Sequence, residues 1–424
     1  MNVVLLIITL LGAPLFAVIA ASAMFGFYNE DVDLAVMAIE IYRLAETPVL
    51  LAIPLFTFAG YILGASRAPH RLVYFTNTLL GWLPGGLAMV AIVACAFFTA
   101  FTGASGVTIV ALGALLYPAL KEAGYGEHFN LGLITSSGSL GLLFAPSLPL
   151  ILYGVVVQQM GMEVTVSIGD LFLAGILPGL LMMFLLSAYS MLQRRQPRST
   201  APKSTKADVV KVLRESVWEL PLPFIVLGGI YSGLFAISEA AAVTVLYVLI
   251  VEVLIKREIP MHDLPRIIRE SMIMVGGILI ILGVSLALTN YIIDSGLPMR
   301  IFDTIKTHID SKWTFLIVLN VFLLALGMIL DIFSALVIVI PIILPIALSY
   351  GIHPVHLGIV FLANMQLGYF TPPVGMNLFI ASYRFERPVM DLYQATIPFF
   401  VILLGAVLII TYWPELSLMF LEQQ

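Results

Sequence analysis

Two stretches of this sequence decide the fold. Residues 134–149 read ITSSGSLGLLFAPSLP, and residues 364–377 read NMQLGYFTPPVGMN. Each lies in an apolar run of membrane-spanning length, and each is interrupted by glycine, proline and hydroxyl residues. Glycine lets a helix unwind without a side-chain clash, and proline lacks the N–H that would otherwise go unpaired. The sequence therefore predicts two broken transmembrane helices, over about 129–157 and about 355–382.

The composition of the 424 residues is typical of a membrane protein. Hydrophobic residues make up 61%, charged residues 11%, and the mean hydropathy is +1.06. An average soluble domain is about half apolar and a quarter charged, so most of this chain must face lipid or the interior of a membrane bundle. The net charge of -5, without a basic domain, excludes nucleic-acid binding. The single cysteine, Cys95, excludes a disulfide framework. We expect an all-α polytopic membrane protein.

Other apolar runs are also long enough to cross the bilayer. They cover about 2–24, 48–65, 169–192, 220–237, 240–255, 271–292 and 395–413. The first run lacks a basic n-region and a cleavage site, which predicts a retained helix and not a signal peptide.

Basic residues set the orientation of these spans. Residues 194–214 carry seven Lys and Arg among Pro and Ser, which predicts a cytoplasmic linker at 194–218 between two halves, 1–193 and 219–424. Other basic flanks should share its side: Arg67, Arg71, Lys121, Lys256, Arg257, Arg384 and Arg387. This arrangement places the N-terminus inside and the C-terminus outside. Residues 30–46 are either an amphipathic surface helix or an extra span, and a span would reverse the N-terminus.

Two apolar segments do not fit simple crossing. Residues 72–120 contain no Asp, Glu, Lys or Arg, yet both flanks are predicted to be cytoplasmic. Residues 313–350 lie between Lys312 and a loop at 351–354 that is predicted to be external. Each segment has a polar, glycine-containing break near its middle, at 102–106 and at 327–331. We expect two re-entrant helical hairpins, at about 85–120 and about 313–350, whose tips meet polar groups inside the membrane.

The two halves are related by a constant shift. Moving the sequence by 227 positions places Pro118 on Pro345, Gly141 on Gly368 and Pro146 on Pro373. Opposite entry sides for the two hairpins then predict an inverted-topology repeat. Paired broken helices in such repeats are the best sequence indicator of a transporter's site at the bilayer midplane.

The breaks offer ligands for ions of both signs. Freed carbonyls and Ser/Thr hydroxyls can replace the hydration shell of a small cation, and half-helix N-termini favour an anion. Asp331 is the only Asp, Glu, Lys or Arg between Trp313 and Tyr383. A charged side chain at the centre of a membrane helix costs about 2.5–3.5 kcal/mol. The partner of Asp331 is either a cation from solution or a distant Arg or backbone N–H groups. The hydroxyls have the alternative role of hydrogen bonding between helices.

Competing functions have little support in the sequence. Gly103–Gly106 matches the G-x-S-G pattern of rhomboid proteases, but all six histidines fall in predicted loops or at span ends, so Ser105 lacks a base. No second buried Asp accompanies Asp331, and no Walker A motif is present. His353 and His356 more simply start a helix than bind a metal. A channel would not need paired broken helices. We therefore expect no catalytic residue, no cofactor and no metal other than sodium.

Four motifs together resemble those of the large membrane subunit of tripartite ATP-independent periplasmic (TRAP) transporters. They are Thr102-Gly-Ala-Ser-Gly-Val-Thr108, residues 134–154, Ser238-Glu-Ala-Ala-Ala242 and Gly368-Tyr-Phe-Thr-Pro-Pro-Val-Gly-Met-Asn377. The resemblance implies a sodium-driven importer in a bacterial or archaeal inner membrane. It also implies an elevator mechanism, in which a scaffold holds a mobile domain made of both hairpins and both broken helices. The amphipathic stretches near 66–82 and 205–218 would be scaffold arms.

The resemblance also implies partners and site residues. The partners are a small four-helix membrane subunit, expected as a separate chain, and a periplasmic protein that delivers a small organic anion. The first sodium site would use Gly103, Ser105, Ser136, Ser137 and Gly138; the second would use Gly327, Asp331, Thr371 and Gly375; the substrate would lie near Ser105, Pro146, Pro373 and Asn377. The alternatives are a stand-alone sodium/carboxylate symporter or a sodium/proton antiporter.

Overall fold

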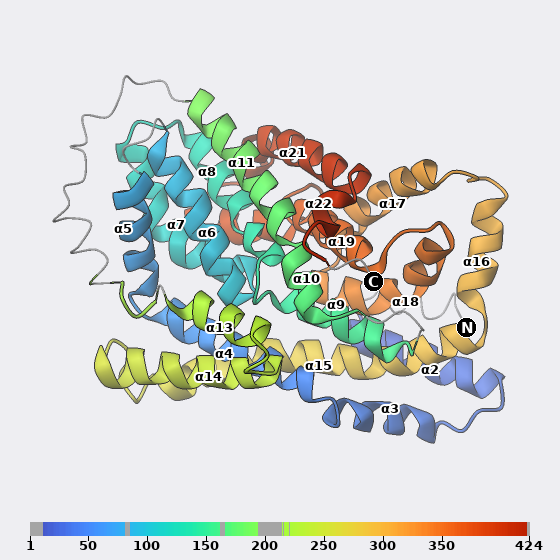
Figure 1. Ribbon diagram of the computed structural model, residues 1–424. Helices are drawn as coiled ribbons and strands as arrows, with labels where there is room; N and C mark the ends of the chain where they lie inside the picture. The colour runs from blue at the N-terminus through green and yellow to red at the C-terminus, as the bar shows by residue number, and fades with distance from the viewer. Residues whose placement is uncertain are drawn as a thin grey trace.

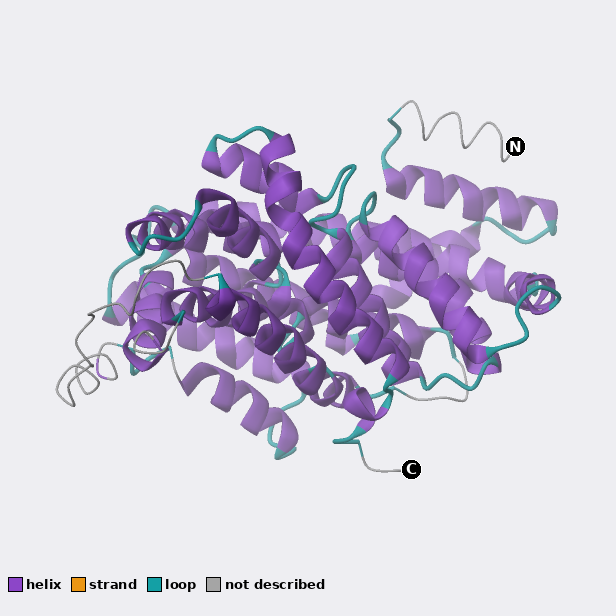
Figure 2. Ribbon diagram, turned by 90° about the horizontal axis from the view of Figure 1, so that it is seen from above, coloured by secondary structure: helices purple, strands orange, loops and turns teal. Residues whose placement is uncertain are grey.

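The computed structural model describes residues 12–80, 85–161, 166–193, 214, 216–219 and 221–421. Throughout these residues the regular elements are helices, joined by loops (Figures 1 and 2). Six of the described helices are long and apolar enough to cross a membrane: Pro48–Ala65, Ile168–Leu192, Ile237–Ile255, Leu264–Asp294, Ile332–Ser349 and Val389–Tyr412. The prediction of an all-α polytopic membrane protein is confirmed.

One side of the molecule is a layer of helices taken from both halves of the chain (Figure 1). Its helices are α2 (Leu15–Asn29), α3 (Ala35–Ala45), α4 (Ala52–Ala65), α13 (Pro221–Tyr231), α14 (Ile237–Leu249, continued by a π-helix over Ile250–Ile255) and α15 (Leu264–Asp294). The long α15 contacts α2, α3 and α4. The 11 residues of α3 rise only about 16 Å, against a hydrocarbon core of about 30 Å, so the structure favours the surface-helix alternative for 30–46. The predicted span 2–24 is described only from residue 12.

Two amphipathic helices connect this layer to the rest. Helix α5 (Ala68–Leu80) packs on the first hairpin, and α16 (Leu297–Lys306) packs on the second, at opposite ends of the layer (Figure 1). The amphipathic stretch predicted near 66–82 contains α5, and its role as a scaffold arm stays a prediction. The stretch 205–213 lies outside the described residues. Helix α16 was not predicted, because Arg300 and Asp303 interrupt its few apolar residues.

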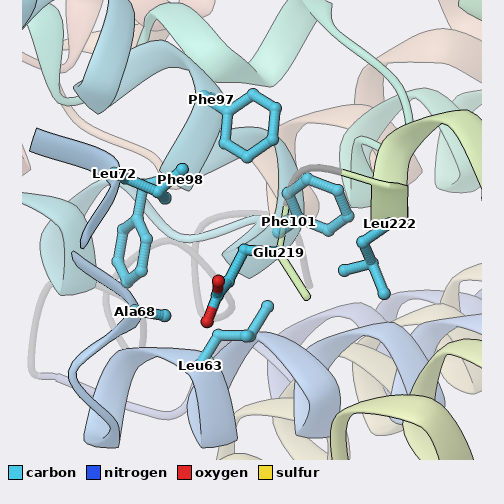
Figure 3. Close-up of a pocket in the computed structure, with 8 residues that line it drawn as sticks. All are labelled: Leu63, Ala68, Leu72, Phe97, Phe98, Phe101, Glu219 and Leu222. Carbon is cyan, nitrogen blue, oxygen red and sulfur yellow. The ribbon is translucent and has the colours of Figure 1, made fainter. Parts of the chain in front are cut away.

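Buried charges fasten α5 to the layer. The Arg71 guanidinium contacts the carboxylates of Glu219, Glu252 and Glu258, and the Lys256 ammonium contacts Glu219. Glu219 also lines a cavity of about 10 Å³ between α4, α5 and α6, enough for about one water molecule (Figure 3). Burial alone would raise the pKa of Glu258, but hydrogen bonds from the Arg71 guanidinium and the Arg67 amide lower it below its ordinary value.

Two helical hairpins lie where the sequence predicts them. The first consists of α6 (Gly86–Thr102) and α7 (Ser105–Glu122), and the second of α17 (Lys312–Gly327) and α18 (Ile332–Ser349). The first tip turns at Gly103, whose φ of 62° suits glycine. A Cβ there would lie 2.4 Å from the Leu148 Cδ1 atom, so the tip is held tightly against the first broken helix.

Both predicted spans with internal breaks are broken. The first consists of α8 (Glu127–Ser137), a 3₁₀ turn at Leu140–Leu143 and α9 (Leu148–Gln159), with a bend of 41°. The second consists of α19 (Pro354–Gly368) and α20 (Met376–Phe385). The Ala145–Pro146 and Pro372–Pro373 peptide bonds are cis. The remaining helices are α10 (Ile168–Ala174), α11 (Ile176–Leu192), α21 (Val389–Tyr412) and the short α22 (Glu415–Leu418).

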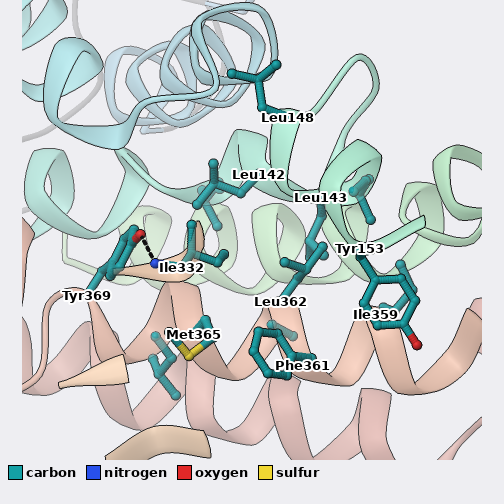
Figure 4. Close-up of a cluster of buried hydrophobic side chains, with 14 of the residues drawn as sticks. Leu142, Leu143, Leu148, Tyr153, Ile332, Ile359, Phe361, Leu362, Met365 and Tyr369 are labelled. Atoms are coloured by element: carbon teal, nitrogen blue, oxygen red, sulfur yellow. Dashed lines mark hydrogen bonds between the residues drawn. The ribbon is translucent and has the colours of Figure 1, made fainter. Parts of the chain in front are cut away.

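The two broken spans meet in the buried core. Leu142 and Leu143 of the first break pack among side chains of α19, including Phe361 and Leu362 (Figure 4). All four side chains are at most 1% exposed. Inside a membrane such packing, and not the exclusion of water, holds helices together.

The shift of 227 residues also relates the observed elements. It moves both ends of α7 onto both ends of α18, and the first residue of α8 onto the first residue of α19. The contacts follow the same relation: α7 packs on α20 of the other half, and α18 packs on α9 of the other half.

Candidate functional site

The first hairpin and the second broken helix meet through two half-helix N-termini. Helix α7 begins at Ser105 and α20 begins at Met376, and the Ser105 hydroxyl donates to the Asn377 Oδ1 atom at 2.7 Å. Both side chains are at most 2% exposed. Neither helix has a side chain that caps its N-terminus, because Ala104 and Gly375 occupy the N-cap positions. The first-turn N–H groups of α7 therefore have no side-chain cap and can bind an anion. In α20, the N–H groups of Asn377 and Leu378 already donate to the carbonyls of Tyr369 and Gly375.

Asn377 ties this meeting point to both breaks. Its Nδ2 atom is 3.4 Å from the Thr135 carbonyl oxygen in the first broken helix. Its backbone N–H donates to the Tyr369 carbonyl at 2.9 Å in the second break. A single buried amide thus contacts a hairpin and both broken spans, so movement of any one of them would disturb the others.

Oxygen atoms crowd around Thr99 in the first hairpin. Its hydroxyl lies 2.8 Å from the Cys95 carbonyl oxygen, 2.8 Å from the Gly138 carbonyl oxygen and 2.7 Å from the Thr108 hydroxyl. A hydroxyl carries one proton, so it cannot donate to both carbonyls at once. Such a surplus of oxygens suits a small hard cation. Sequence reasoning missed Thr99 and Thr108, although two threonines in an apolar hairpin were a usable signal.

The other predicted residues of the first sodium site differ in their surroundings. Ser136 donates its hydroxyl to the Gly132 carbonyl of its own helix at 2.8 Å, which satisfies it locally. The Ser137 hydroxyl is fully buried and has no hydrogen-bond partner among the described residues. Gly138 supplies the carbonyl near Thr99, and Gly103 lies buried at the hairpin tip. The oxygens of Ser137 and Gly138 are therefore better placed than that of Ser136 to bind a cation.

The second hairpin tip and the second break touch through their backbones. A Cβ on Gly368 would lie 2.6 Å from the Gly327 Cα atom, so only glycine permits this approach. The Gly375 N–H donates to the Met328 carbonyl at 3.0 Å. The Tyr369 hydroxyl accepts from the Ile332 N–H at 2.7 Å (Figure 4). The predicted residues Gly327 and Gly375 are thus brought together at one place.

Asp331 caps the second hairpin. Its Oδ1 atom accepts from the N–H groups of Phe333 and Ser334, both at 3.0 Å, and its Oδ2 atom accepts from the Ser334 hydroxyl. The alternative partner foreseen for this charge, backbone N–H groups, is therefore present. The carboxylate is only half-buried, so its remaining lone pairs stay accessible to a cation. Thr371 donates its hydroxyl to the Leu367 carbonyl at 2.7 Å.

The two predicted substrate prolines differ in exposure. Pro146 is buried at the first break. Pro373 is exposed at the second break, and its carbonyl accepts from the Tyr393 hydroxyl of α21. The contacts at the α7–α20 meeting point come from Ser105 and Asn377 and not from the prolines.

His353 and His356 make hydrogen bonds that stabilise the fold. His353 accepts from the Val355 N–H at the start of α19, as expected of a helix-starting residue. The buried His356 ring contacts the Ser417 hydroxyl and the Thr411 carbonyl. Over the described part of the chain, no group of three or more His, Cys, Asp or Glu side chains could hold a metal ion. Ser105 faces an amide and not a base, so it is not arranged as a nucleophile.

Residues 2–416 match the protein family described as "Tripartite ATP-independent periplasmic transporter, DctM component". The C4-dicarboxylate TRAP transporter large permease protein DctM of Rhodobacter capsulatus is 32% identical, over 98% of this chain and 96% of its own length. The ectoine/5-hydroxyectoine large permease protein UehC of Ruegeria pomeroyi is 31% identical, over 98% of this chain and 96% of its own length. The isethionate permease protein DctMQ of Oleidesulfovibrio alaskensis is 34% identical, over 88% of this chain and 58% of its own length.

A solved structure shares the fold at low sequence identity. The YdaH transporter of Alcanivorax borkumensis superposes with a TM-score of 0.61 at 13% identity, over 87% of this chain and 85% of that chain. The curated relatives are permease proteins and not enzymes, in agreement with the contact of Ser105 with an amide.

Proposed function

Because the chain belongs to the DctM family of tripartite ATP-independent periplasmic transporters, we propose that it imports a small organic anion, a carboxylate or sulfonate, driven by sodium. The observation that carries this proposal is the meeting of α7 and α20 at Ser105 and Asn377. Two uncapped N-termini of half-helices lie together there, and each favours negative charge. The substrate's anionic group would bind at the first-turn N–H groups of α7, with Ser105 and Asn377 as side-chain contacts.

Sodium would bind on either side of this anion. One ion would use the oxygens gathered at Thr99 and Gly138, with the unpaired Ser137 hydroxyl as a further ligand. The other would use Asp331 and backbone oxygens near Gly327 and Thr371. Each sodium ion that enters down a membrane potential of about 100 mV supplies about 2.3 kcal/mol before its concentration term. Two ions per monovalent anion would therefore drive accumulation.

The repeat of 227 residues supports inverted topology and an elevator motion. The Ser139 hydroxyl donates to the Gln366 carbonyl at 3.3 Å, and these residues are related by the same shift. A contact between equivalent positions is expected near a pseudo-two-fold axis. The layer containing α4 and α15 would be the static scaffold. Helices α5 and α16 would be the arms that hold the hairpins and broken helices as one mobile body.

The partners follow from the family. A small four-helix membrane subunit would cover part of the scaffold, and a periplasmic binding protein would deliver the anion from outside. The complex would lie in the cytoplasmic membrane of a bacterium or archaeon. Substrate choice would be shared between the binding protein and the α7–α20 site.

The test is uptake into proteoliposomes that contain this chain, its small subunit and a loaded binding protein. Succinate and isethionate serve as probes, since related permeases are named for C4-dicarboxylates and isethionate. Uptake that needs all three proteins and an inward sodium gradient is the expected result. Sodium-driven uptake by this chain alone would instead establish a stand-alone symporter. Sodium efflux coupled to proton entry, without anion uptake, would establish an antiporter.

A further inference from the structure

Arg384 lies along the same interface as the proposed anion site. It follows Asn377 by seven residues on α20, which is about two turns or 10.5 Å along the axis and nearly the same face of the helix. Its Nε atom donates to the Val110 carbonyl of α7 at 3.1 Å. Ser105 and Asn377 thus mark one end of the α7–α20 interface. Val110 and Arg384 lie toward the other end, where Phe385 packs against Tyr117.

The Arg384 side chain points away from the carbonyls at the end of its own helix and toward α7. A basic residue in the last turn of a helix commonly bonds that helix's own final carbonyls. Here the guanidinium crosses instead to α7. The Val110 side chain that marks this place is 46% exposed, so the surface around it is open.

Arg384 also carries an uncompensated charge. Its neighbour Arg387 pairs with Glu127, whereas no carboxylate of the described residues lies within ion-pair distance of Arg384. With Nε bonded to Val110, the four N–H groups on its two Nη atoms remain. A guanidinium edge of this kind binds a carboxylate or sulfonate through two oxygens.

This end of the interface faces the predicted cytoplasmic side. A cavity of about 290 Å³ is lined by Glu127, Gln193 and Gln394, so these residues lie close together. Gln193 directly precedes the basic linker, and Glu127 binds Arg387 in the loop after α20. The positive-inside rule assigns that end to the cytoplasm. Arg384 therefore lies between the proposed anion site and the cytoplasm.

We propose that Arg384 is a second anion contact, which receives the carboxylate or sulfonate group as it leaves Ser105 and Asn377 for the cytoplasm. The inference rests on the proposed function and adds to it a binding residue on the cytoplasmic side. Arg384 should affect binding from the cytoplasmic side and leave capture from the binding protein unchanged.

The test uses the complete reconstituted complex with Arg384→Met. Proteoliposomes are filled with increasing unlabelled succinate, and the initial uptake of labelled succinate from the binding protein is measured. Losing a charge-assisted pair should raise the internal concentration that halves uptake by about 5–10-fold. The external concentration of loaded binding protein that gives half-maximal uptake should change by less than about twofold. Arg384→Lys, which keeps charge but not the planar fork, should show a smaller rise of about 2–3-fold.

Two controls separate this role from others. Arg257→Met removes an arginine that also bonds a backbone carbonyl, that of Leu254, and should leave both concentrations unchanged. Vesicles of pure phosphatidylcholine are compared with vesicles containing phosphatidylglycerol, because a lipid headgroup offers similar anionic chemistry. A rise seen in both lipids supports the transported anion as the ligand. A rise seen only with phosphatidylglycerol assigns Arg384 to lipid and overturns the inference.

Other results are equally decisive. Equal changes on both sides would show a structural role for Arg384, and no change on either side would show no role; both overturn the inference while leaving the proposed function in place. A wild-type complex that transports neither succinate nor isethionate under any ion gradient would overturn both.

Discussion

The two hairpin tips share an architecture but differ in charge. A shift of 227 residues places Ala104 and Ser105 of the first tip on Asp331 and Ile332 of the second. In the second tip, the Asp331 carboxylate caps its own helix by accepting from two backbone N–H groups. In the first tip, Ala104 offers no cap, and the N-terminus of α7 stays unneutralised.

The helices that face the two tips also differ in polarity. Helix α7 faces Asn377 on α20, whereas the position related to Asn377 in α9, the partner of α18, is the fully buried Leu150. One copy of the repeat therefore keeps its positive helix end and a polar partner for an anion. The other copy has its own carboxylate and can attract a cation instead. We therefore propose that two similar backbones bind ions of opposite sign.

The largest effect is expected from making the first tip resemble the second. Ala104→Asp would place a carboxylate over the N-terminus of α7, where the backbone of Ala104 already has the extended geometry of an N-cap (φ -130°, ψ 106°). The added carboxylate would occupy the N-terminus of α7 and repel the anion. Like charges in contact cost several kcal/mol. Sodium-driven uptake should fall on the order of 100-fold or more.

Ala104→Asn is the matched control, because it caps without charge. It should reduce uptake much less than Ala104→Asp, and both variants should unfold at or above the temperature of the wild type. Equal losses in the two variants would show that the tip needs a small residue and that charge is irrelevant there.

A smaller effect is expected from removing the charge of the second tip. Asp331→Asn keeps a good N-cap residue, so the helix should stay folded. The sodium concentration that gives half-maximal uptake should rise about 10-fold or more, because hydrogen bonding and ion pairing to a charged group stabilise by about 1.5–3 kcal/mol. Unchanged sodium activation, measured in the same proteoliposomes, would leave Asp331 as a helix cap only.

The sequence predicts the two tips well because the residue types that mark them are rare inside apolar segments. Glycine-containing breaks mark both tips, and a lone Asp in a long uncharged stretch marks the second. The helices begin and end close to the expected positions. Helix α16 was missed because a short amphipathic helix leaves no long apolar run.

Individual ligands are harder to predict, because a hydroxyl in an apolar helix can face any direction. Ser136 and Ser137 are adjacent and chemically identical. Only the structure shows one bonded to its own helix and the other without a partner. Likewise, the contact between Ser139 and Gln366 depends on how two spans cross, which no local pattern in either span specifies.

The sodium role of the first tip can be tested at Thr99. Thr99→Val removes the hydroxyl that contacts the Gly138 carbonyl and keeps the shape of the side chain. Losing one neutral ligand should raise the half-maximal sodium concentration about 3–10-fold, since such an interaction is worth about 1 kcal/mol. Thr57→Val is the control, because the equally buried Thr57 hydroxyl bonds only its own helix, at Ile53. If both variants shift sodium activation alike, the oxygens around Thr99 are not a sodium site.

The smallest effect separates Ser136 from Ser137 in the first break. The Ser136 hydroxyl donates to the Gly132 carbonyl, which the helix already engages, so Ser136→Ala should change the half-maximal sodium concentration by less than about twofold. Ser137→Ala removes the unpaired hydroxyl instead. If Ser137 binds sodium, this variant should raise that concentration about 3–10-fold.

Thermal unfolding adds an independent measurement, because a bound ion stabilises the folded state in proportion to the logarithm of its concentration over its dissociation constant. Stabilisation by NaCl relative to KCl should therefore weaken in Ser137→Ala and persist in Ser136→Ala. Removing an unpaired buried hydroxyl without loss of a ligand would instead stabilise the protein in both salts. That result would make Ser137 a structural residue and leave the first sodium site to Thr99 and Gly138.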